Sequence, residues 1–245
     1  MRIHDSLAIA ASFQFGLAGP LDCHVYVLRA PDGVVLIDAG AGTHTERLLA
    51  NVRQDFGDVA VRALVLTHCH ADHAGGAAEI RRLTGCAVYA PKATRPIVEN
   101  ADEEAMGLRA AREAGVYPAE FRVLPCPVDG VLKDGEKLSI AGLPFTPIHV
   151  RGHSRDAFCL LAERQLFSGD VLFYGGILGL INAEGSEMAG YRADLHKLAG
   201  LAVEGLFPGH GMFTLRGGQR HIDCAIAQAA KGFIPRQVGQ WDLIF

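Results

Sequence analysis

The sequence predicts an α/β fold, in which helices pack on β-sheets. Apolar residues make up 49% of the 245 residues and charged residues 20%, a balance that can fill a sizeable core. Between residues 24 and 91, apolar runs of strand length alternate with an amphipathic stretch of helical period. One such run, 61–68, is apolar at nearly every position, which is typical of a strand buried on both faces. The length favours one domain over residues 1–245.

In chain order, the first predicted element is a hairpin at 24–40, because "HVYVLRAPDGVVLIDAG" holds two apolar runs joined by Pro-Asp-Gly. A helix is predicted over 43–56, where Leu48, Leu49 and Val52 have helical spacing. After the buried strand, "GGAAEIRRLTG" predicts a helix that ends at Gly85, and "CAVYAP" predicts another strand. Residues 100–120 are charged and alanine-rich, and predict a helical insertion.

The second half returns to strands before a final helix. Strand patterns occupy 134–150 and 203–211, and 157–170 contains two strands with a turn near Glu163 and Arg164. The last helix is predicted over 218–233. The apolar tail "WDLIF" beyond it needs cover, either from the domain itself or from a partner chain, as in a homodimer.

The apolar N-terminal stretch "LAIAASFQFGLAG" is interpreted as an edge strand rather than a signal peptide. Its leader "MRIHDS" carries an acid and a single Arg, and Phe13 and Phe15 alternate as in a strand. The six cysteines show no CxxC spacing, which favours a reducing cytoplasm over a disulfide framework. No apolar run reaches the ~18 residues of a membrane span. The net charge of −4, with no basic run, argues against nucleic acid as a partner and leaves a small-molecule substrate.

The segment "LTHCHADHAGG" (66–76) carries the chemistry. His68 and His70 leave a strand end two positions apart, so their imidazoles point to the same side and can converge on one ion. Asp72 and His73 lie at the turn into the next helix and can face a second ion. Chance would produce this H-x-H-x-D-H pattern in a chain of this length on the order of one time in a thousand.

Further ligand types follow later apolar runs. His153 stands in "VRGHSRD", Asp170 closes "LFSGD", and His210 lies in "FPGHG", each beside a glycine that permits a tight turn. Each residue alone would most simply be a solvated loop residue. Together with the first motif, they predict a site for two metal ions.

These motifs, in this order from "VLIDAG" to "PGH", resemble the metallo-β-lactamase superfamily, most closely its glyoxalase II and lactonase branch. The resemblance implies a four-layer αβ/βα sandwich of two mixed β-sheets flanked by helices. It also implies a first metal on His68, His70 and His153, a second on Asp72, His73 and His210, and Asp170 bridging the two. Asp38 matches the position that accepts a hydrogen bond from the ligand loop and so orients an imidazole.

The nitrogen and oxygen donors suit two divalent ions, zinc above all, although iron and manganese also accept such a set. Two ions roughly 3.5 to 4 Å apart lower the pKa of a bridging water, and the resulting hydroxide would cleave an ester, thioester or lactone. Asp72 is predicted to move the proton to the leaving group. Tyr174, four positions after Asp170, is predicted to donate to the carbonyl oxygen, in competition with an ordinary packing role.

The sequence departs from the thioesterase pattern after the bridging aspartate. A basic residue follows the two glycines in the glutathione thioesterase, whereas here "GGILGLIN" is apolar. This favours a small, partly apolar substrate against a wall of Phe173, Ile177, Leu178 and Leu180, unless these side chains belong to the core. The insertion at 100–120 is a candidate lid. His24, His149 and Cys69 are expected to make local contacts only, and no function is assigned to His196 or His221.

Two other classes of function stay open. A mononuclear iron oxygenase resembling persulfide dioxygenases would load one metal through residues matching His68, His153 and Asp170. A binding protein on a degenerate fold is less compatible, because no ligand is missing from the set. The acidic charge argues against RNA phosphodiester hydrolysis, and the absence of a convincing leader argues against a secreted β-lactamase.

Overall fold

The computed structural model describes residues 1–231 as two compact units, each with its own sheet and helices. The first unit comprises residues 1–132 and 139–143, and the second comprises 133–138 and the chain from Pro144 onward. Each unit is α/β, as predicted. The interpretation of 1–245 as a single domain stays a prediction.

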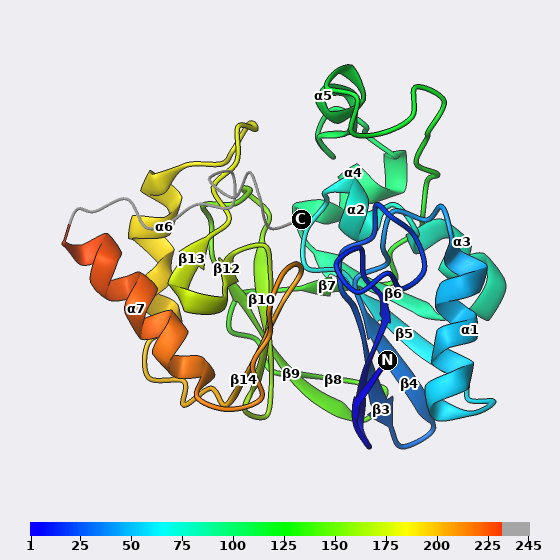
Figure 1. Cartoon of the computed structure of the whole chain (residues 1–245), viewed down its shortest axis with the longest axis horizontal. Coiled ribbons are helices and arrows are strands. Elements are labelled where there is room, and N and C mark those ends of the chain that lie inside the picture. Colours follow the sequence, from blue (N-terminus) through cyan, green and yellow to red (C-terminus); the bar gives the residue numbers. More distant parts are fainter. Residues whose placement is uncertain (232–245) are drawn as a thin grey trace. The chain divides into compact units, whose positions relative to one another are not determined.

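The first unit contains a seven-stranded mixed sheet whose spatial order follows the chain order (Figure 1). The first four strands pair antiparallel, and the pairs from the fourth strand to the seventh are parallel. The strands are β1 (Arg2–His4), β2 (Leu7–Ala11), β3 (Val25–Ala30), β4 (Gly33–Ile37), β5 (Val61–Val65), β6 (Ala87–Pro91) and β7 (Gly130–Leu132).

The predicted hairpin and the buried strand are both confirmed. β3 and β4 pair antiparallel, with Tyr26 opposite Ile37. β5 lies between β4 and β6 in parallel pairing, and four of its five residues are buried, which explains its nearly continuous apolar run. The histidine segment therefore begins at the carboxyl end of a central parallel strand.

The N-terminal interpretation is wrong in one respect. β2 has every residue buried and lies between β1 and β3, so it is not an edge strand. Phe13 and Phe15 lie beyond it in a turn and are 41% and 42% exposed. Their alternation therefore reflects a turn that leaves both rings at the surface, because the strand has already ended at Ala11.

The predicted helices of the first unit are also present. α1 (Thr45–Phe56) packs on β2 through a face that includes Leu48, Leu49 and Val52. α3 (Ala77–Thr84) ends at Gly85, which adopts the left-handed conformation and donates its N–H to Arg81. α4 (Thr94–Asn100) was not predicted, because only Thr94 and Val98 of this short helix are buried and no apolar periodicity marks it.

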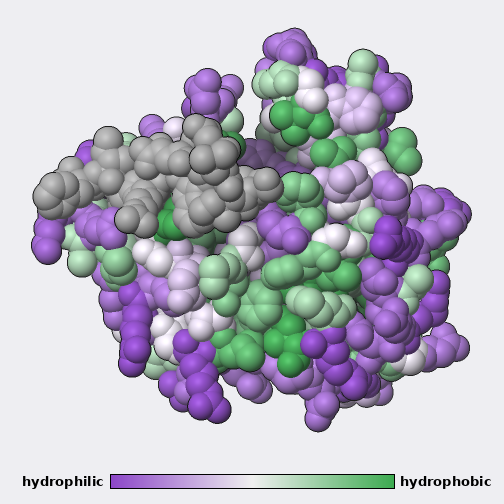
Figure 2. All heavy atoms as spheres, in the orientation of Figure 1, coloured by the Kyte–Doolittle hydropathy of each residue, from purple (hydrophilic) through white to green (hydrophobic). Residues whose placement is uncertain are grey.

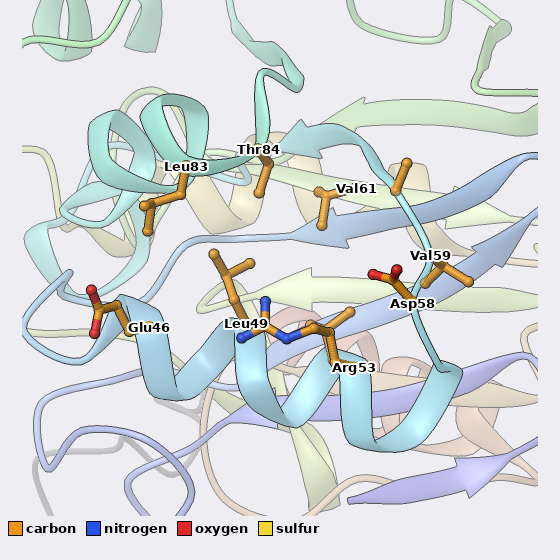
Figure 3. Close-up of a pocket in the computed structure, with 10 residues that line it drawn as sticks. Glu46, Leu49, Arg53, Asp58, Val59, Val61, Leu83 and Thr84 are labelled. Carbon is orange, nitrogen blue, oxygen red and sulfur yellow. The ribbon is translucent and has the colours of Figure 1, made fainter.

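A hollow of about 430 Å³ lies beside α1 and the end of α3 (Figure 3). Its lining includes Leu49 and Arg53 of α1, Asp58 and Val61 of the following segment, and Leu83 of α3. None of its lining residues is a predicted metal ligand. It is therefore separate from the predicted chemistry.

The insertion is helical only in part. α2 (Ala71–Ala74) precedes it and holds Asp72 and His73 of the motif, whereas in the insertion only α5 (Leu108–Glu113) forms a helix between turns and extended chain. In Figure 1, α5 projects beyond α2 and α4, away from the strands of its unit. Val116 and Leu124 are each 58% exposed, and the projecting surface mixes hydrophobic with hydrophilic residues (Figure 2).

The second unit is built around a five-stranded mixed sheet of order β14-β11-β10-β9-β8. The predicted pair around Glu163 and Arg164 is confirmed as an antiparallel hairpin, and β11 pairs parallel with the last strand. The strands are β8 (Leu138–Ile140), β9 (Leu143–His149), β10 (Phe158–Ala162), β11 (Gln165–Gly169) and β14 (Gly205–Pro208), with a small separate pair of β12 (Leu172–Phe173) and β13 (Ile177–Leu178). β8 and the start of β9 straddle the division between the units.

The helices of the second unit are α6 (Met188–Asp194), the 3₁₀ segments η1 (Tyr174–Gly176) and η2 (Leu195–Leu198), and α7 (Gly218–Ala230). α7 packs on η1 and on β12, β13 and β14. The predicted final helix is thus confirmed as far as Ala230, and "WDLIF" lies outside the described residues. Across residues 1–231, no helix has the length and hydropathy needed to cross a bilayer.

Candidate metal centre

The first unit brings the four motif residues together at the end of β5. His68 is fully buried, and its Nε2 lies 3.1 Å from Nδ1 of His70. Two ring nitrogens at this separation can share one proton or bind one cation. The two imidazoles therefore converge, as predicted, but both residues lie in the loop after β5, which ends at Val65, and not at the strand end itself.

The single-turn helix α2 returns the chain toward the same place. The ring centroids of His73 and His68 lie 4.2 Å apart, and Nε2 of His73 is 3.5 Å from a carboxylate oxygen of Asp72. His73 is fully buried, whereas the Asp72 side chain is 26% exposed. Asp72 thus offers a partly exposed carboxylate beside a buried imidazole.

Asp38 organises this loop from the end of β4. One carboxylate oxygen accepts a hydrogen bond of 2.8 Å from the Thr67 N–H, and the other lies 2.8 Å from Nδ1 of His73. The Thr67 hydroxyl donates to the same carboxylate at 2.8 Å. The predicted hydrogen bond from the ligand loop to Asp38 is confirmed. Asp38 contacts both the backbone of the loop, at Thr67, and an imidazole, that of His73.

The second unit brings its three predicted ligands together around one carboxylate. Asp170 directly follows β11, His153 follows β9, and His210 follows β14. One oxygen of Asp170 lies 3.8 Å from Nε2 of His153 and 3.5 Å from Nε2 of His210. A carboxylate between two imidazoles is the arrangement expected of a ligand that bridges two ions.

The contacts of the Nδ1 atoms fit metal binding. In three of the histidines Nδ1 meets an oxygen of the protein: Thr67 Oγ1 at 3.0 Å for His68, Asp38 Oδ2 at 2.8 Å for His73 and the Gly179 carbonyl at 2.6 Å for His153. The acceptors at His73 and His153 hold the proton on Nδ1 and leave the Nε2 lone pair available to a metal. The donor set is nitrogen and oxygen only, which suits a divalent cation such as zinc or iron.

Sequence analysis missed Cys23, which belongs to the same neighbourhood. Its backbone N–H donates to the Asp72 carbonyl at 3.3 Å, and its Sγ lies within 4.8 Å of ligand atoms of Asp38 and His73. Complete burial raises the pKa of the Cys23 thiol to about 12, so the sulfur stays protonated at neutral pH. No spacing rule marks a lone cysteine more than forty residues before the motif.

The residues expected to make local contacts do so. His24 stacks on Phe15, with ring centroids 5.2 Å apart, and Nε2 of His149 meets the Arg155 carbonyl at 2.9 Å. The Cys69 thiol donates to the Ala105 carbonyl. These contacts are structural, in agreement with the prediction.

Tyr174 is 39% exposed and lies against His221, with ring centroids 4.3 Å apart. Its predicted contact with a substrate carbonyl stays a prediction. The alternative that the predicted apolar wall belongs to the core holds for Leu178, which is fully buried in the core of the second unit, where β13 contacts α7. Leu180 lies beyond β13 and is partly buried against the same core, and its contact with a substrate stays a prediction.

Residues 18–210 match the family model of the metallo-β-lactamase superfamily. The chain belongs to this superfamily. The structure known as TTHA1623 in a di-iron-bound form has the same fold, at a TM-score of 0.65 and 32% identity, over 82% of this chain and 94% of that one. The predicted fold class is thereby confirmed.

Two relatives of this chain carry the names of enzymes. The human acyl-coenzyme A thioesterase MBLAC2 is 28% identical over 88% of this chain and 81% of its own length. The hydroxyacylglutathione hydrolase of Marinomonas sp. is 25% identical over 79% of this chain and 63% of its own length. The relatives of this chain in the superfamily thus include hydrolases.

Proposed function

We propose that this metallo-β-lactamase-fold protein is a dinuclear metal-dependent hydrolase that cleaves an acyl thioester. The observation that carries the proposal is the pair of ligand sets, His68 to His73 in one unit and Asp170 between two imidazoles in the other. We infer that both sets hold the same two ions. His68, His70 and His153 would bind the first ion, Asp72, His73 and His210 the second, and Asp170 both.

The relatives favour a thioester over the ester and lactone alternatives. MBLAC2 is an acyl-coenzyme A thioesterase, and a hydroxyacylglutathione is also a thioester. When bound, two divalent ions polarise the acyl carbonyl and lower the pKa of a bound water toward neutrality. Zinc and iron both suit the donors, and TTHA1623 is known with two irons.

The side chains of this protein would manage the protons. In thioester hydrolysis a water oxygen bonds to the carbonyl carbon, the carbon–sulfur bond breaks, and a carboxylic acid and a thiol result. Asp72 would take a proton from the water and deliver it to the departing sulfur, because it is partly exposed beside buried His73. Tyr174 would donate to the carbonyl oxygen from the exposed side of η1.

The first test is elemental analysis of the purified protein beside an acyl-thioester assay that follows thiol release. The proposal expects about two divalent ions per chain and metal-dependent thiol release. His210→Ala should bind about one ion and lose most activity, because it removes a ligand of one ion only. His196→Ala is the matched control, since His196 is an exposed histidine of η2 to which no ligand role is assigned.

The same measurement tests the oxygenase alternative. A mononuclear iron enzyme would hold about one iron in the wild type and would keep it in His210→Ala, because its metal would depend on His68, His153 and Asp170. That result, together with oxygen consumption in the presence of a persulfide, would replace the hydrolase proposal.

A further inference from the structure

Tyr191 of α6 is completely buried in the second unit, and its phenol bonds to two backbone groups. The hydroxyl donates to the Val171 carbonyl at 2.8 Å and accepts from the Gly179 N–H at 3.1 Å. Burial raises the pKa of the phenol well above its ordinary value, so the group stays neutral and keeps its donor. One hydroxyl therefore ties two chain segments together.

Both segments carry predicted metal ligands. Val171 directly follows Asp170, and the Gly179 carbonyl accepts the hydrogen bond from Nδ1 of His153 at 2.6 Å. The Tyr191 hydroxyl thus bonds the residue that follows Asp170 in the chain. It also bonds Gly179, the residue whose carbonyl orients the imidazole of His153. A shift of the Gly179 peptide would turn the imidazole of His153 as well.

The backbone at Gly179 and Gly152 is packed so closely that neither position has room for a Cβ atom. A Cβ on Gly179 would lie 1.8 Å from the Asp170 carbonyl oxygen and 3.0 Å from Nδ1 of His153. A Cβ on Gly152, which precedes His153 and has a φ of +136°, would lie 2.3 Å from the Tyr191 ring. The ring therefore fixes the backbone before His153, while its hydroxyl holds the N–H of Gly179, the residue whose carbonyl bonds the imidazole of His153.

We propose that Tyr191 is the positioning residue that sets the relative placement of His153 and Asp170. The inference rests on the proposed function, in which these two side chains are metal ligands. Nε2 of His153 lies 3.8 Å from an oxygen of Asp170, so small displacements of either group change the angle at which both meet an ion. Loss of a group that orients a ligand typically weakens metal binding about 10–100-fold.

Tyr191→Phe tests the inference, because the ring stays against Gly152 while the hydroxyl is lost. Metal-free protein is titrated with Co(II) in competition with a chromophoric chelator, and the visible absorption of the cobalt-saturated protein is recorded. We expect Co(II) affinity to fall about 10–100-fold and the saturated spectrum to change. A residue that only stabilised the fold would leave the saturated spectrum as in the wild type.

Tyr26→Phe is the matched control, since Tyr26 is a tyrosine of β3 that is 1% exposed and lies in the first unit. It should keep the wild-type spectrum. Gly179→Ala keeps the phenol but pushes against Asp170 and His153, so it should weaken Co(II) binding in the same direction as Tyr191→Phe. This second variant decides the matter if Tyr191→Phe does not fold.

The outcomes separate the inference from the proposed function. Wild-type affinity and spectrum in Tyr191→Phe would overturn the inference and leave the hydrolase proposal intact. Wild-type behaviour of a folded Gly179→Ala would overturn it as well. A wild-type protein that binds no Co(II) would overturn both, because Tyr191 would then have no ligands to position.

Discussion

Asp38 makes its contacts to the ligand loop with one buried carboxylate, so its removal should affect metal binding and stability together. In Asp38→Ala the Thr67 N–H and the Nδ1–H of His73 would lose their acceptor in a site that is 2% exposed. We expect the free energy of unfolding to fall by about 1–3 kcal/mol and metal affinity to fall about 10–100-fold. Urea unfolding of the metal-free protein and chelator competition measure the two effects separately.

Asp129→Ala is the control for that prediction. Asp129 also accepts a backbone hydrogen bond, from the Val88 N–H at 2.8 Å, and pairs with Arg81 in the same unit. Among the contacts described for residues 1–231, none joins Asp129 to a predicted ligand, so the variant should lose some stability and keep its metal affinity. Equal metal affinity in both variants would refute the orienting role of Asp38.

At the scale of single residues, motif spacing identifies the residues that cluster in the candidate metal centre. All seven predicted ligands lie in one of two clusters because each follows a strand, and strand ends could be located from apolar runs. Tyr191 and Cys23 could not be found this way. Both residues are buried and make hydrogen bonds with backbone groups. The sequence around them does not distinguish them from ordinary core residues.

At the scale of elements, the end of α6 holds the loop before His153 by charge. Asp194 is buried, and bonds the guanidinium of Arg151 at 2.6 Å and Lys197 at 3.2 Å. Burial raises the pKa of its carboxyl, but the hydrogen bonds from Arg151 and Lys197 outweigh this and hold the pKa below the usual 3.8. A carboxyl with a depressed pKa stabilises the fold above its unfolded pKa and loses that contribution as pH falls through the folded pKa.

Asp194→Asn should therefore be less stable than the wild type at pH 7, and the difference should shrink as pH falls below 3.8. Urea midpoints between pH 7 and pH 2 follow the difference directly. Asp223→Asn serves as the control, because Asp223 is an exposed carboxylate on α7. A difference that grows toward low pH would contradict the assignment.

The insertion should behave as two parts rather than one lid. Met106 and Leu108 are buried in the core of the first unit, and the Met106 carbonyl accepts the Ala71 N–H at 3.3 Å. Hydrogen exchange should be slow at the amides of Ala71 and Leu108 and fast at those of Ala119 and Glu120, which are exposed. Uniformly fast exchange from 100 to 120 would instead support a lid that moves as a whole.

Strands and long helices were predictable because burial imposes a period, whereas short elements were not. The hairpin of β3 and β4 and the helix α1 each repeat the pattern over ten or more residues. α4 has seven residues, and β12 and β13 have two each, so no period develops within them. Their positions depend on tertiary packing, for example of β12 and β13 against α7.

At the scale of the whole molecule, metal should stabilise a protein that already has its fold. Each unit has its own apolar core, so removal of metal by a chelator should leave the helices and strands in place. A ligand at 100 times its dissociation constant stabilises the native state by about 2.7 kcal/mol, which corresponds to a rise in Tm of roughly 5–10 °C for a chain of this size. Thermal unfolding with and without zinc measures the rise.

Asp170→Ala should abolish that rise in Tm, because the same carboxylate oxygen lies between His153 and His210 and would serve both ions. Asp223→Ala should retain it, since Asp223 contacts only Gln219 among the contacts that the structure gives its side chain. If Asp170→Ala still gained the full wild-type stabilisation from zinc, the metal would bind without the carboxylate that joins the two halves of the ligand set. The dinuclear proposal requires the opposite, because without Asp170 no side chain of the set is shared by both ions.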